Sequence, residues 1–108
     1  MSLSDGKEGK NRHERDGIFS LRLYIAGRGP NSSRAIANLE EICRIYLSSG
    51  HRVEIIDILE EPTRAISDGI LVTPTLIKLS PGPQGKVIGD LSETKKVLKA
   101  LGLKEGKE

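Results

Sequence analysis

The feature that most constrains this 108-residue chain is the order in which strand-like and helix-like segments follow one another. Some short segments are rich in β-branched and apolar residues, as strands are, whereas others repeat apolar residues every three or four positions, as helices do. The strand-like segments are 18–26, 53–59, 75–79 and 86–89, and the helix-like segments are 32–48, 62–66 and the segment that follows Ser92. The predicted order is therefore β-α-β-α-β-β-α.

Chain connectivity turns this order into an architecture. Two strands that are joined through a long helix pair in parallel with a right-handed crossover, and the last two strands, joined by the turn 80–85, form an antiparallel hairpin. We expect Asn31 or Ser32 to cap the first helix and Ser92 to cap the last one. The prediction is an α/β domain with a mixed four-stranded sheet, which is the connectivity of the thioredoxin-like fold. In the last helix, Val97, Leu98 and Leu101 are predicted to point inward and Lys95, Lys96 and Lys99 outward.

The two ends of the chain differ from the middle. Residues 1–17 hold one large apolar residue besides the initiator, so we expect a disordered tail, then a single domain over 18–103 and a frayed end at 104–108. No apolar run approaches the ~20 residues of a membrane span. The net charge of +2 gives no indication of a nucleic-acid partner, and the single cysteine fits the reducing cytoplasm.

Thiol chemistry is not predicted, although the topology invites it. Thioredoxin-like enzymes place a reactive cysteine where the first strand meets the first helix, because the helix N-terminus stabilises its thiolate. Here that junction, residues 27–32, reads Gly-Arg-Gly-Pro-Asn-Ser, and Cys43 falls on the apolar face of the predicted helix as a small buried residue. The histidines, His13 and His51, make no metal-ligand cluster with one cysteine. We predict a binding module without catalytic, cofactor or metal site, and keep an oxidoreductase as the remote alternative.

Three short blocks stand in order along the domain. The first is Leu-Tyr-Ile-Ala-Gly at 23–27, followed by Pro-Asn-Ser at 30–32 and Arg-Ala at 34–35. The second is Ile-Leu-Val-Thr-Pro-Thr-Leu at 70–76, and the third is Ile-Gly-Asp-Leu-Ser at 88–92. In content and spacing these blocks resemble the KaiB family of circadian-clock proteins, over about residues 18–103.

The resemblance implies a non-enzymatic regulator. Proteins of this family bind the ring-shaped ATPase KaiC and modulate its phosphorylation or output signalling, with KaiA or a clock histidine kinase as further partners. Three departures leave an alternative open: the N-terminal tail is long, the acidic C-terminal tail of the cyanobacterial clock proteins is missing, and the turn at 81–85 lacks the paired basic residues common there, leaving Lys86. The alternative is a KaiB-like module that acts on a histidine kinase or in stress response without a clock.

The family is also metamorphic, which bears on the expected fold. One form is a thioredoxin-like monomer that binds KaiC, and the other is a tetramer in which the C-terminal half is arranged differently. The pattern of residues 86–101 is that of a strand, a turn and a helix. Because this local pattern agrees with the thioredoxin-like form, we expect that form here.

The resemblance also selects candidate residues. Arg34 and Lys86 match basic positions of the family and are our candidate partner contacts, with Tyr24 as a neighbour. Pro74, Gly89 and Asp90 are candidate structural or switch positions. Thioredoxin-like domains commonly carry a cis proline at the start of the third strand, so we predict that the Thr73–Pro74 bond is cis, a form that is rare among X-Pro bonds.

Overall fold

The computed structural model describes residues 18–103, so the predicted tail at 1–17 and the predicted frayed end at 104–108 lie outside the described residues. The order of elements confirms the predicted succession. In chain order they are β1 (Phe19–Ile25), α2 (Pro30–Tyr46), β2 (His51–Asp57), α3 (Pro62–Ser67), β3 (Thr75–Ser80), β4 (Gly85–Ile88) and α4 (Thr94–Leu101).

The four strands form one sheet in the order β2-β1-β3-β4. Strands β1 and β2 are parallel because the long helix α2 carries the chain back between them. Strand β3 is antiparallel to both β1 and β4. The predicted mixed sheet is therefore confirmed, and β2 and β4 are its two edge strands.

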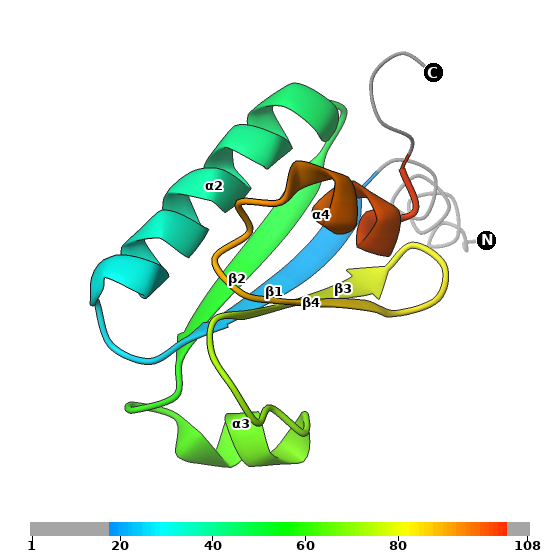
Figure 1. Ribbon diagram of the computed structural model, residues 1–108. Coiled ribbons are helices and arrows are strands. Elements are labelled where there is room, and N and C mark those ends of the chain that lie inside the picture. The colour runs from blue at the N-terminus through cyan, green and yellow to red at the C-terminus, as the bar shows by residue number, and fades with distance from the viewer. Residues whose placement is uncertain (1–17, 104–108) are drawn as a thin grey trace, which may run out of the picture.

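Helices α2 and α4 cover one face of the sheet, and α3 packs on the other (Figure 1). The main core lies under α2 and α4, where alternate residues of β1 meet the apolar stripes of both helices. Burial of each large apolar side chain there contributes about 1.5–3 kcal/mol to folding. The inward prediction for α4 is confirmed, since Val97, Leu98 and Leu101 are buried. The smaller cluster under α3 contains Tyr24, Ile56, Ala65 and Ile77.

Both predicted helix caps were wrong. Helix α2 begins at Pro30 with Gly29 as its N-cap, because the first helical N–H has no partner within the helix and proline, which lacks it, fits there. Helix α4 begins at Thr94, and no side chain caps it. The N–H of Ser92 instead donates to Oδ1 of Asp90 at 3.0 Å, which holds Ser92 in the preceding loop.

Strand β4 and helix α4 approach each other closely at Gly85. A Cβ placed on Gly85 would lie 2.1 Å from the carbonyl oxygen of Ala100 and 3.0 Å from its carbonyl carbon. Only glycine leaves room for this approach of the two backbones. Gly85 therefore fixes how deeply α4 sits on the end of the sheet.

Candidate partner-binding surface

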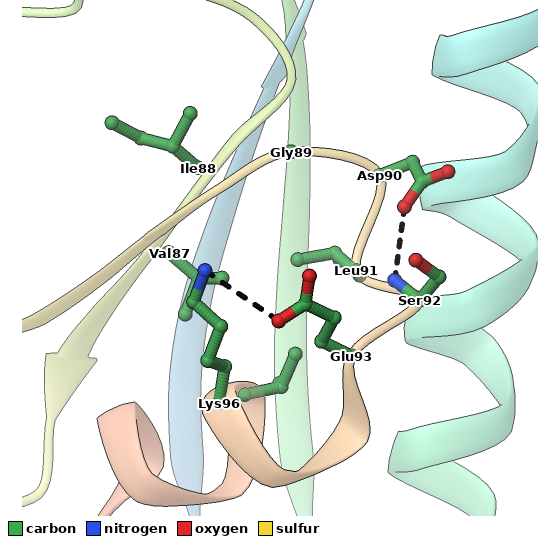
Figure 2. Close-up of a pocket in the computed structure, with 9 residues that line it drawn as sticks. Val87, Ile88, Gly89, Asp90, Leu91, Ser92, Glu93 and Lys96 are labelled. Atoms are coloured by element: carbon green, nitrogen blue, oxygen red, sulfur yellow. Dashed lines mark hydrogen bonds and ion pairs between the residues drawn. The ribbon is translucent and has the colours of Figure 1, made fainter.

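The connection from β4 to α4 contains two of the predicted structural positions, Gly89 and Asp90. Gly89 has a φ of +118°, and Leu91 has a φ of +68°, which is unusual for a residue with a side chain. Asp90 accepts the hydrogen bond from Ser92 across this turn (Figure 2). The turn lines a cavity of about 60 Å³, which has room for a few water molecules at most.

Arg34 is tied to this turn from helix α2. Its Nε donates to Oδ2 of Asp90 at 3.2 Å, and its guanidinium also donates to the side-chain oxygen of Asn31. The side chain of Asn38 donates to the backbone oxygen of Asp90 at 2.8 Å. Hydrogen bonds from Ser92, and then the charge of Arg34, hold the pKa of Asp90 below its usual value. Arg34 keeps 56% of its side chain exposed, so it remains accessible while it anchors the turn.

Lys86 lies on β4, next to a groove between that strand and α4. The groove has a volume of about 330 Å³ and is lined by Lys86, Val87, Ile88, Lys96, Lys99 and Ala100. None of these six residues is acidic, so the groove is basic with an apolar floor. Sequence reasoning predicted that Lys96 and Lys99 point outward but did not place them beside Lys86. Their spacing of three on a helix was the available signal, because residues so spaced share a face.

Pro74 is joined to Gly89 by a backbone hydrogen bond. The Thr73–Pro74 bond is cis, which confirms the prediction, and the Ser80–Pro81 bond, for which we had predicted no isomer, is also cis. The N–H of Gly89 donates to the carbonyl oxygen of Pro74 at 2.9 Å. Two of the three predicted structural positions are thus in contact, at the end of the β3–β4 pairing.

Tyr24 does not belong to this surface. It has no exposed area, so the prediction that it contacts a partner is wrong for this structure. It points to the α3 face of the sheet, where its hydroxyl donates to a carboxylate oxygen of Asp68 and lies 3.3 Å from the backbone oxygen of Arg64. Burial, and then the bond to Asp68, raise the pKa of Tyr24. Arg22 donates to the same carboxylate oxygen of Asp68 at 2.9 Å.

The junction of β1 with α2 carries no thiol, and Cys43 is buried in the last turn of α2. Burial, assisted by the charge of Glu40, raises the pKa of Cys43 to about 11. Its thiol is therefore protonated at neutral pH, which is the opposite of an activated cysteine. Within residues 18–103 there is no group of three His, Cys, Asp or Glu side chains that could hold a metal ion, and no helix there is long and apolar enough to cross a membrane.

Comparison by sequence identifies a family that spans most of residues 18–103. A model of the KaiB domain matches residues 22–103. The circadian clock protein KaiB3 of Synechocystis is 52% identical over 83 residues, which cover 77% of this chain and 81% of that protein. The circadian clock oscillator protein KaiB of Trichodesmium erythraeum is 46% identical over 85 residues, which cover 79% of this chain and 82% of that protein.

Comparison by structure agrees on the fold. The N-terminal domain of SasA from Synechococcus elongatus superposes with a TM-score of 0.65 at 22% identity, covering 85% of this chain and 90% of that one. Mitochondrial thioredoxin 3 from Saccharomyces cerevisiae superposes with a TM-score of 0.64 at 20% identity, covering 94% of this chain and 92% of that one. The fold is therefore thioredoxin-like, as predicted.

Proposed function

The chain belongs to the KaiB family, and from that premise we propose that it is a non-enzymatic regulator that binds a KaiC-like ATPase ring and modulates its phosphorylation or output signalling. The observation that carries the proposal is the extent of the family match. It runs from β1 to the end of α4 and so includes every element that builds the candidate surface. The relatives that match over most of their length are named circadian clock proteins.

We propose that Arg34 and Lys86 contact the ring. Both are exposed and basic, and a short set of contacts connects them. Arg34 bonds to Asp90, which lies two residues beyond Ile88, the last residue of the strand that carries Lys86. A guanidinium that is already oriented by a carboxylate loses little conformational freedom when it meets a partner. Tyr24 is left out of the proposed contact because it is buried.

Binding to a purified KaiC-like ring in its ADP-bound state tests the proposal. We expect the wild-type protein to bind, and Arg34→Met and Lys86→Glu each to weaken binding about tenfold, equivalent to about 1.4 kcal/mol. Arg44→Met is the matched control, because Arg44 is an exposed α2 arginine that pairs with Glu41. Absence of wild-type binding at about 50 µM, well above the micromolar range of weak specific complexes, would refute the proposal.

The oxidoreductase alternative lacks support. A thiol at the strand–helix junction is needed for it, and the single cysteine is buried with its pKa raised to about 11. An insulin-reduction assay tests this directly, and we expect no turnover above the dithiothreitol background. Activity that Cys43→Ser abolishes would overturn this conclusion.

A further inference from the structure

Within residues 18–103, strand β4 has a strand neighbour on one side, β3, and its other side is an edge of the sheet. The bond from Gly89 to Pro74 and the pairing of Val87 with Leu76 fix which residues bond to β3. In an antiparallel pair, residues alternate between those that bond to the neighbouring strand and those that face away. The N–H and C=O groups of Lys86 and Ile88 therefore point to the open edge, where another strand could bond to them.

The charged side chains that line the groove beside this edge are all lysines. Lys86 and Lys99 make no ion pair with any residue from 18 to 103. Lys96 pairs loosely with Glu93, with 3.6 Å between its Nζ and the Oε1 of the glutamate (Figure 2). Ile88 leaves 59% of its surface exposed beside them. A single lysine on an edge strand would suffice to deter pairing with other strands. Lysines on α4 that line the same groove add positive charge next to the edge and favour an acidic occupant.

We propose that the β4 edge binds an extended acidic segment of a partner protein as an added strand, with its carboxylates beside Lys86, Lys96 and Lys99. Added strands obtain affinity from main-chain hydrogen bonds and specificity from alternate side chains. Side chains two residues apart on a strand lie about 6.6–7 Å apart. Lysines three apart on a helix have Cβ atoms about 5–6 Å apart. Their flexible side chains are long enough to bridge the difference between this spacing and that of the carboxylates on the strand. The inference rests on the proposed function only in sharing Lys86.

The other edge strand, β2, provides an internal comparison. The groove beside it is lined by Glu40, Arg44 and His51 together with apolar residues, so its charges are mixed. An acidic strand has no electrostatic reason to prefer that edge. The proposal therefore predicts which of the two edges an acidic peptide selects.

The test uses an eight-residue, end-capped peptide in which Glu alternates with Val, carrying a fluorophore. We expect binding to the wild-type protein at low ionic strength, weakened by salt, and about tenfold weaker for the same peptide N-methylated on alternate amides. In amide NMR spectra the largest shifts should fall on Lys86 and Ile88. Equal binding of both peptides, no binding, or shifts centred on residues 51–55 of β2 would overturn the proposal.

Charge variants complete the test. Lys99→Glu and Lys96→Glu should each weaken peptide binding about tenfold, whereas Lys95→Glu, an exposed α4 position outside the groove, should change it less than about threefold. An equal effect at all three positions would indicate non-specific attraction and contradict the proposal. Because the peptide assay contains no ATPase ring, failure of ring binding and failure of peptide binding are observed separately.

Discussion

Gly85→Ala should weaken the packing of α4 on the sheet more than its one added methyl group suggests. The new Cβ would lie 2.1 Å from the carbonyl oxygen of Ala100, which is 1.3 Å closer than the 3.4 Å at which ordinary contact begins. The atom it meets is backbone, so no side chain can rotate away. The helix, the strand or both must move.

The size of the effect follows from what that movement disturbs. Helix α4 buries Val97, Leu98 and Leu101, each exposed by 2% or less. Overpacking of a well-packed site costs about 1–3 kcal/mol, and partial withdrawal of these side chains adds to it. We expect the free energy of unfolding to fall by about 2–4 kcal/mol, and the melting temperature by about 4–8 °C for each kcal/mol.

Urea unfolding followed by circular dichroism measures this change. Gly29→Ala is the matched control, since its Cβ would meet nothing within 4 Å and its φ of −71° suits any residue. We expect the control to change stability by less than about 1 kcal/mol, because a better unfolded-state entropy offsets a poorer helix cap. Equal stability of Gly85→Ala and Gly29→Ala would refute the close approach of β4 and α4.

Three further changes test the interior of the domain. Cys43, with a pKa of about 11, should react with iodoacetamide at neutral pH only after unfolding in urea, and fast labelling of the native protein would contradict its burial. Tyr24→Phe should lower the free energy of unfolding by about 1.5–3 kcal/mol, the range for a hydrogen bond to a charged group, and an unchanged urea midpoint would count against that bond. The pKa of Asp68 is lowered in the folded state, mainly by the bond from Tyr24, so its ionised form stabilises the fold above the unfolded pKa, and this contribution is lost as pH falls through the folded value. Asp68→Asn should therefore flatten the decline of stability between about pH 5 and pH 2, and an identical decline in both proteins would refute this assignment.

Sequence reasoning succeeded where the cause is local or topological. The order of elements followed from periodicity, the mixed sheet from connectivity, and the burial of Cys43 from its place on an apolar helix face. It failed where a specific hydrogen bond or contact decides. Serine is a residue type that often caps helices, but the N–H of Ser92 donates to Asp90 in the loop, and helix α4 starts two residues later.

Tyr24 shows the same limit more clearly. The family resemblance placed it beside the candidate partner contacts, and the missing information was that Asp68, 44 residues away, provides a partner for its hydroxyl beneath α3. The sequence pattern predicted that Lys96 and Lys99 point outward, but only the docking of α4 on β4 brings them beside Lys86. Neither contact is encoded in a periodicity, because each joins elements that are brought together by tertiary packing.

The location of the charged groups connects the fold to its proposed role. In a thioredoxin-like domain the helix N-terminus after β1 can acidify a thiol, yet here that position holds Gly29 and Pro30, and the one cysteine is neutral in the core. The groups that we propose for partner contact lie instead at the β4 edge and at Arg34. Asp90 holds the side chain of Arg34, which belongs to α2, beside the turn that follows β4, so we expect a partner that contacts Lys86 on the strand to reach Arg34 as well. Loss of the Asp90 carboxylate should therefore weaken ring binding through Arg34 while leaving the binding of a short acidic strand at β4 unchanged.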